Sequence, residues 1–179
     1  AVAVPLEAAK RPLLLIGGQA RTPRGRAALA ACVDRWQVPV ATSYKHQDLF
    51  DNHHPCFAGH LGFGLPPAAW QQLTEADLIV AIGTRLNEIT TQRYRIPKAP
   101  VPDQPLIHIH PDPAQVGRVF ETTISIVADT IPFLEALAAR TPRRSTGSAW
   151  QDRLHSAVSE LARWTPSDAP DGVDFGHVV

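Results

Sequence analysis

Short apolar runs alternate with segments of helical periodicity along most of the chain. Five of these runs are too short for a typical helix and predict buried strands at residues 13–16, 38–42, 78–83, 106–110 and 124–127. Apolar spacing predicts helices at residues 26–36, 66–73, 113–120 and 130–139, with Thr22 as N-cap and Pro23 at the start of the first. This alternation predicts an α/β fold: a doubly wound parallel sheet of five or six strands with helices on both faces, Rossmann-like, with strand order 3-2-1-4-5.

The carboxyl ends of the predicted strands form the candidate binding site. Right-handed crossovers bring these ends to one edge of the sheet, where open α/β sheets bind ligands. The residues at the ends are Gly17, Thr42, Gly83, His110 and Asp129. At Gly83, a positive φ or the close approach of a ligand would favour glycine. Arg85 could clamp a diphosphate through paired hydrogen bonds, or it could be a surface arginine bonded to a strand-end carbonyl or a carboxylate. Asp129 could accept a hydrogen bond from a ribose hydroxyl, but we favour a role as the cap of the helix that follows it, with ligand contact as a second role.

Two segments fit no regular element. Residues 59–64 are rich in glycine and are interpreted as a flexible segment of close approach. Residues 96–105 contain four prolines, which remove backbone donors and fix an extended backbone. This second segment therefore predicts a long crossover without a helix.

The C-terminal part differs in character from the rest. We assign residues 1–140 to the sheet domain and residues 141–179 to a linker, an amphipathic helix and the lead into a further domain. The helix is predicted at residues 149–164, with Trp150, Leu154, Ala157, Val158, Leu161 and Trp164 on one face. We expect Trp150 and Trp164 to pack this helix onto either the sheet domain or another domain.

Composition excludes several classes of protein. The 179 residues carry zero formal net charge, which gives no general reason to bind nucleic acid. No apolar run approaches the roughly 20 residues needed to cross a bilayer, and residues 1–10 lack the pattern of a signal peptide. Cys32 and Cys56 form neither a disulfide framework nor a metal-like spacing. We expect a cytoplasmic protein without nucleic-acid or membrane partners, and the absence of methionine suggests a piece of a longer or processed chain.

The histidines raise the question of a metal site. His53-His54-x-Cys56 and His108-x-His110-x-Asp112 place donor atoms close together in sequence. In a strand, His108 and His110 would point to the same face, so a two-histidine site is geometrically feasible. Zinc requires a third and a fourth ligand, and no partner cluster is evident. We therefore predict polar histidines at a strand end rather than a metal site.

Four segments in sequence order resemble the central domain of thiamine-diphosphate-dependent enzymes, in the acetolactate synthase and benzoylformate decarboxylase-like group. They are residues 11–18, 59–69, 77–88 and 106–113, and the resemblance covers residues 10–140. It implies a three-domain enzyme, with the catalytic glutamate in a preceding domain and a metal-binding Gly-Asp-Gly motif in a following one. This chain contains no Gly-Asp-Gly. The resemblance thus implies that domains beyond this chain bind thiamine diphosphate and magnesium. It implies no catalytic residue and no metal ligand here, and as partners the other domains of the same enzyme in a homo-oligomer.

The resemblance also implies a nucleotide site, because some members bind FAD or ADP in this domain while others leave it empty. The positions that correspond to nucleotide contacts are Gly17, Gly18, Thr42, Ser43, Tyr44, Leu61, Gly62, Phe63, Gly83, Thr84, Arg85, His110, Pro111 and Asp129. FAD-binding synthases carry a third glycine where Gln19 stands and a histidine where Gly64 stands. They also carry an aspartate and an arginine in place of Asn87 and Ile89. These departures argue against tight FAD binding.

Three functions follow as hypotheses. The first is a scaffold domain, with a site for FAD or ADP, of an enzyme that cleaves or forms carbon–carbon bonds at 2-keto acids or related carbonyls. This chain alone would be inactive. A free-standing nucleotide-binding regulatory module is an alternative. An NAD-dependent oxidoreductase is another, and it lacks the expected acidic residue after the second strand, which ends in Thr42 and Ser43.

Overall fold

The computed structural model describes residues 1–143, 149–160 and 163. Its helices are α1 (Ala3–Ala8), α2 (Pro23–Trp36), α3 (Pro67–Thr74), α4 (Thr130–Ala138) and α5 (Ala149–Ser159). Its strands are β1 (Pro12–Ile16), β2 (Val40–Ser43), β3 (Phe57–Leu61), β4 (Leu78–Ile82), β5 (Leu106–His110) and β6 (Ile124–Val127). Two short 3-10 helices, η1 (Gly18–Ala20) and η2 (Gln47–Leu49), follow β1 and β2.

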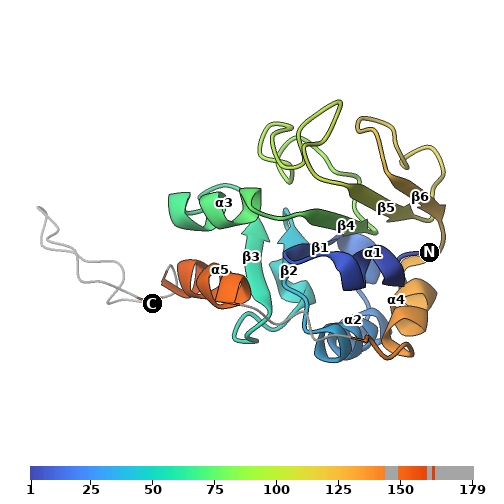
Figure 1. The fold of residues 1–179 in the computed structure, drawn as a ribbon, viewed down its shortest axis with the longest axis horizontal. Helices are drawn as coiled ribbons and strands as arrows, with labels where there is room; N and C mark the ends of the chain where they lie inside the picture. Colours follow the sequence, from blue (N-terminus) through green and yellow to red (C-terminus); the bar gives the residue numbers. More distant parts are fainter. Residues whose placement is uncertain (144–148, 161–162, 164–179) are drawn as a thin grey trace, which may run out of the picture.

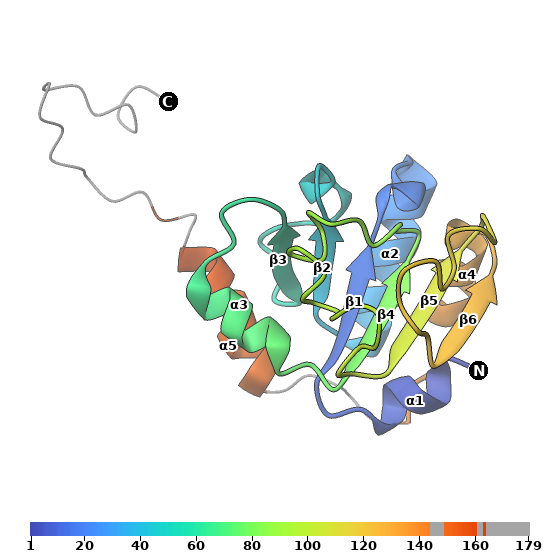
Figure 2. The ribbon, with the colours of Figure 1, turned by 90° about the horizontal axis from the view of Figure 1, so that it is seen from above.

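The six strands form one parallel sheet in the order β3-β2-β1-β4-β5-β6, seen side by side in Figure 2. This confirms the predicted doubly wound sheet. β1 lies at its centre, where Leu14 is opposite Val40 of β2 on one side and Val80 of β4 on the other. The chain therefore reverses its direction of travel across the sheet between β1 and β4, which is the point where such sheets bind ligands.

β3 was not predicted as a strand, since its residues 59–61 fell in the segment interpreted as flexible. The strand contains Gly59 with φ of 100° and the half-buried His60, and these two residues obscure the apolar pattern. Pairing with β2 fixes it, with a register shift between Val40 and Thr42. Tertiary contact rather than local sequence thus determines this edge of the sheet.

Side chains of the central strands alternate between two hydrophobic clusters because neighbouring strand residues point to opposite faces. Leu14, Ile16, Val80 and Ile82 pack with α2 and α4, while Leu13, Leu15 and Ile79 pack on the other face with α3 and α5. Figure 1 shows α2 and α4 on one side of the sheet and α3 on the other. The helices on both faces agree with the predicted class.

The start of α2 agrees with its sequence signal. The Thr22 hydroxyl accepts a hydrogen bond from the Gly25 amide at 3.0 Å, and Pro23 occupies the first turn. This cap satisfies an amide that has no partner within the helix. At the other end, the Trp36 indole N–H donates to the Leu137 carbonyl at 2.9 Å and ties α2 to α4.

The predicted helix at residues 113–120 is wrong. The segment forms consecutive turns, in which the Asp112 carboxylate accepts from the Ala114 amide at 2.9 Å. Gly117 then adopts φ of 68°, which cannot continue a right-handed helix. In contrast, residues 96–105 contain no helix, as predicted, and Ile96 is buried against the sheet.

Trp150 packs α5 onto the sheet domain. Its indole N–H donates to the Gln72 carbonyl of α3 at 2.9 Å, and Leu154 one turn later is fully buried. The predictions for Leu161, for Trp164 and for residues 165–179 lie outside the described residues. Within the described ranges, no helix combines the length and apolar character needed to cross a membrane.

Candidate functional site

The carboxyl ends of β1, β2, β4 and β5 surround a cavity of about 390 Å³. From the predicted site it brings together Gly18, Ser43, Tyr44, Gly83, Thr84, Arg85 and His110. Gln19, His46 and Asn87 also line the cavity, although they were not among the predicted contact residues; Gln19 and Asn87 were noted only as departures from FAD-binding synthases. We call it the strand-end cavity.

Gly83 is required by the chain itself. Its φ is 63°, as the sequence analysis expected, and its amide donates to the Ile109 carbonyl at 2.9 Å. A Cβ at this position would lie 2.6 Å from the Thr130 hydroxyl and 2.8 Å from Cβ of Gln19. The groups that closely approach Gly83 are therefore Thr130 of α4 and Gln19 of η1.

Gly17 and Gly18 are also explained by packing. Gly17 has an extended backbone and lies beneath the cavity, where a Cβ would collide with the Gly83 carbonyl oxygen. A Cβ on Gly18 would lie 2.6 Å from Cε1 and Nε2 of His46. The imidazole of His46 thus packs against the α-carbon of Gly18.

His46 presents a half-buried imidazole ring at this site. Burial lowers its pKa, and the Arg21 guanidinium lowers the pKa further, against the opposing effect of Asp48. Its Nδ1 is buried and forms no hydrogen bond within the described part of the chain. The strand order gives a signal that could have identified it, because His46 follows β2 by three residues and β2 is adjacent to β1.

Arg85 is exposed at the rim of the cavity. Among the described residues its side chain forms neither an ion pair nor a hydrogen bond, so neither of the surface roles considered for it is observed. It lies close enough to Asp112 to help lower the pKa of that carboxyl, which is held low mainly by the Ala114 amide and the Gln115 side chain. The guanidinium therefore retains its capacity to bind an anion.

Buried hydroxyls lie at the same edge of the sheet. Thr42 and Thr130 are buried, and their Oγ1 atoms form no hydrogen bond within the described ranges. Asp129 stands at the N-cap position of α4, but its exposed side chain forms no capping hydrogen bond, so the favoured capping role is wrong. The first turn of α4 therefore keeps amides without a side-chain cap.

His108 and His110 serve the backbone of the neighbouring loops. Nε2 of His108 donates to the Thr84 carbonyl at 2.9 Å, and Nδ1 of His110 accepts from the Asp112 amide at 3.0 Å. Burial is the main cause that lowers the pKa of His108. Over the described residues, no three His, Cys, Asp or Glu side chains are grouped to hold a metal ion.

The remaining predicted positions lie outside the strand-end cavity. Thr42 and Leu61 are buried, Pro111 is half-buried, and Asp129 is exposed. Gly62 and Phe63 line a second cavity of about 500 Å³, beside the loop at residues 88–95. The structure thus places seven of the fourteen predicted positions in the strand-end cavity and two in the second cavity, while the other five line neither.

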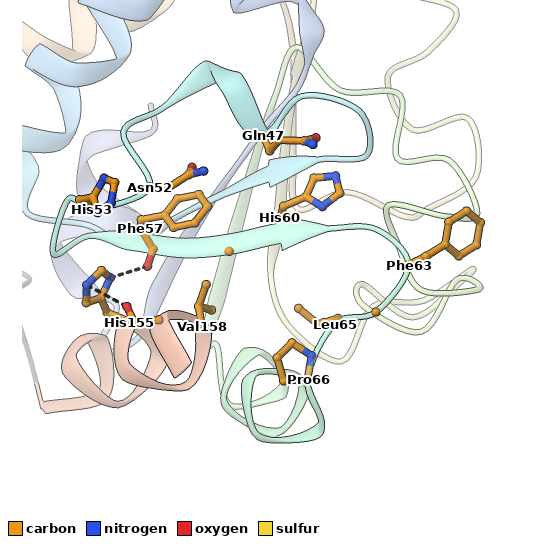
Figure 3. A pocket seen from close by; sticks show the side chains of 13 residues that line it. Gln47, Asn52, His53, Phe57, His60, Phe63, Leu65, Pro66, His155 and Val158 are labelled. Carbon is orange, nitrogen blue, oxygen red and sulfur yellow. Dashed lines mark hydrogen bonds between the residues drawn. The ribbon is translucent and has the colours of Figure 1, made fainter. Parts of the chain in front are cut away.

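A third cavity, of about 510 Å³, lies between β3, the loop around η2, and α5 (Figure 3). Phe57, His60 and Val158 line it, together with His155, whose Nδ1 donates to the Phe57 carbonyl at 3.1 Å. This bond attaches α5 to the outer edge of the sheet. This cavity could not be predicted from the sequence, because β3, which forms one of its walls, was not predicted as a strand.

Comparison with known proteins identifies the family. Residues 1–137 match the family model described as thiamine pyrophosphate enzyme, central domain. A sulfoacetaldehyde acetyltransferase of Rhodobacter capsulatus is 30% identical over 89% of this chain and 27% of its own length. An acetolactate synthase large subunit of Parasynechococcus marenigrum is 29% identical over 84% of this chain and 24% of its own length.

A Pseudomonas aeruginosa protein named "Probable 2-ketoarginine decarboxylase AruI" is 32% identical over 83% of this chain and 25% of its own length. The chain spans about a quarter of the length of these relatives. The sheet topology, the strand-end cavity and the family match agree, and the chain belongs to the thiamine pyrophosphate enzymes, whose central domain it contains in residues 1–137.

Proposed function

We propose that this central domain binds the diphosphate of an adenine nucleotide in the strand-end cavity. The observation that carries the proposal is the Arg85 guanidinium, which forms no hydrogen bond or ion pair among the described residues and stands at the reversal of strand order between β1 and β4. A guanidinium binds phosphate oxygens through paired hydrogen bonds, and such charge-assisted bonds are the strong ones.

The strand-end cavity fits ADP better than FAD. A volume of about 390 Å³ lies near the lower end of the range for small-molecule sites. Gln19 lines the cavity beside Gly83, where FAD-binding members of the family carry glycine, and its side chain takes up room there. We therefore assign ADP, or the ADP part of a larger nucleotide, as the ligand.

Isothermal titration of the chain with ADP, FAD and NAD tests this function. We expect micromolar ADP binding that weakens about 10- to 100-fold in Arg85→Gln, the loss of one charge-assisted contact. Arg35→Gln is the matched control, because Arg35 is exposed in the last turn of α2, at the opposite edge of the sheet. Absence of binding by all three nucleotides would reduce the domain to a scaffold, and an equal loss in both variants would remove Arg85 from the site.

For the whole enzyme, we propose carbon–carbon bond cleavage or ligation at a 2-keto acid or a related carbonyl. The names of its relatives support this class, since they are a synthase, an acetyltransferase and a decarboxylase. Thiamine diphosphate would supply carbanion stabilisation, held with magnesium by other domains of the same polypeptide. The residues described here would bind and position, and the strand-end cavity contains no carboxylate in its lining that could replace a catalytic glutamate.

We further propose a homo-oligomeric, cytoplasmic enzyme. The buried free thiols of Cys32 and Cys56 support a reducing compartment. Turnover of pyruvate with added thiamine diphosphate by this chain alone would contradict the assignment of catalysis to other domains. The same assay on the full-length enzyme provides the positive control, and analytical ultracentrifugation of that enzyme tests the oligomer.

A further inference from the structure

We propose that the second cavity, between the loop at residues 88–95 and the glycine turn at residues 62–65, is a binding site for a short-chain carboxylate. The cavity has a volume of about 500 Å³ and shares no lining residue with the strand-end cavity. Arg93, Arg95 and Glu88 are its charged lining residues, and Phe63, Leu65 and Ile89 supply apolar surface. Gly62 and Phe63 in its lining belong to the positions that the family resemblance implies for a nucleotide, but a carboxylate here does not require a nucleotide in the strand-end cavity.

The two guanidinium groups are available to a ligand. Among the described residues, neither Arg93 nor Arg95 forms an ion pair. Arg95 is held in place, since its Nε donates to the Gln92 carbonyl at 3.1 Å and its guanidinium carbon lies 4.6 Å from the centre of the Trp70 ring. Stacking and one hydrogen bond thus orient this side chain, while its terminal NH₂ groups form no hydrogen bond with the described residues, the preorganisation that anion binding requires.

The backbone that carries these arginines has an unusual conformation. Gln92, Arg93 and Tyr94 have φ of 51°, 62° and 59°, a left-handed turn made entirely of residues other than glycine. The Arg93 amide donates to the Glu88 carbonyl at 2.7 Å, and the Arg95 amide donates to the Thr91 carbonyl at 2.9 Å. Surrounding bonds therefore enforce a conformation that the residues disfavour, which is typical of ligand-binding segments.

Gln92 fixes the two walls of the cavity relative to each other. Its side-chain amide donates to the Gly62 carbonyl at 2.9 Å and to the Ile89 carbonyl at 3.0 Å. Phe63 projects from the glycine turn and away from α5 (Figure 3), and 75% of its surface is exposed. The apolar surface of this ring is thus already in place beside the arginines.

The charge balance selects the ligand. Two guanidinium groups and the Glu88 carboxylate leave the lining with one net positive charge. A single carboxylate satisfies that charge, while a second negative group would meet Glu88 at close range. The apolar lining then favours a short hydrocarbon body over inorganic phosphate, whose charge is higher and which has no apolar part.

Titration of the full chain with sodium butyrate, followed by amide NMR shifts, tests the site. Butyramide is the uncharged probe of the same shape, and inorganic phosphate is the charged probe without a hydrocarbon chain. We expect saturable shifts at the Arg93 and Gly64 amides with butyrate, at least tenfold weaker binding of phosphate, and no saturable shifts with butyramide. Equal shifts with butyramide would overturn the proposal.

Two variants act in opposite directions. Arg93→Gln with Arg95→Gln should weaken butyrate binding at least tenfold, while Arg35→Gln leaves it unchanged. Glu88→Gln should tighten binding severalfold, because it removes the one negative charge from the lining, and a gain of affinity cannot result from misfolding. Butyrate affinity that is unchanged in both the double arginine variant and Glu88→Gln would overturn the proposal.

Discussion

Replacing Gly18 with alanine isolates the contact between the strand-end turn and His46. The new Cβ would lie 2.6 Å from two atoms of the imidazole, whereas nonbonded carbon atoms prefer about 3.5–4.0 Å. Gly18 does not have a positive φ, so alanine meets no backbone penalty there. The ring must move by about 1 Å, and overpacking of this kind destabilises by about 1–3 kcal/mol.

A double-mutant cycle with His46→Ala separates this clash from other effects. If the imidazole is the obstacle, Gly18→Ala should cost little in the His46→Ala background, which gives a coupling energy of about 1–2 kcal/mol. Urea denaturation followed by tryptophan fluorescence measures each free energy of unfolding.

Gly64→Ala is the matched control. Gly64 has φ of 80° and open space around the position of a Cβ, so alanine there brings backbone strain of about 1–2 kcal/mol without a clash. His46→Ala should not relieve that cost. A Gly18→Ala cost that is the same with and without His46 would refute the packing that we describe at the cavity.

Three further predictions concern the rest of the domain. Burial is the first cause that lowers the pKa values of His46, His60 and His108, so the folded state binds protons more weakly than the unfolded state. The free energy of unfolding should have its full value above the unfolded pKa of about 6.5 and should decrease as the pH is lowered further. Equal urea midpoints at pH 7.5 and pH 5.5 would contradict this. Trp150→Phe should lower the free energy of unfolding by about 0.5–1.5 kcal/mol, because the hydrogen bond to the Gln72 carbonyl is lost. Trp150→Ala should lower it by about 3–5 kcal/mol, because the buried ring is lost as well. Equal losses in the two variants would count against the docking of α5. Burial raises the pKa of the Cys32 thiol to about 12 and that of the Cys56 thiol to about 11. A disulfide reagent at pH 8 should therefore label both thiols slowly until urea is added. Rapid labelling of the folded chain would argue against their burial.

The central strands could be predicted because their pattern is local. Pro12–Ile16 and Leu78–Ile82 are uninterrupted apolar runs that are buried at every position, as is typical of central parallel strands. Leu106–His110 is also buried throughout, and its apolar residues remain recognisable although two histidines alternate with them. β3 has no comparable pattern, since Gly59 and His60 interrupt it and its place depends on β2 and α5. An edge strand held by tertiary contacts leaves little trace in its own residues.

The candidate site shows the same division. Residues directly at strand ends, such as Gly83 and Thr84, could be placed because the topology fixes them. His46 and Asn87 lie in loops whose course depends on the Tyr44 amide bonded to the Thr90 hydroxyl at 3.2 Å and on similar long-range bonds. No periodicity encodes such contacts, so the short distance of His46 from β2 could suggest its place at the site, but the course of these loops could not be predicted.

Glycine at a strand end is therefore weak evidence for a ligand in this domain. Each of Gly17, Gly18 and Gly83 is required by the protein's own atoms, namely the Gly83 carbonyl, the His46 ring and the Thr130 hydroxyl. A scaffold that never bound a nucleotide would need the same three glycines. What packing does not require is a guanidinium at the rim without a partner among the described residues, since an exposed arginine adds nothing to the core. Arg85 is thus the residue whose substitution separates a working nucleotide site from a purely structural sheet edge.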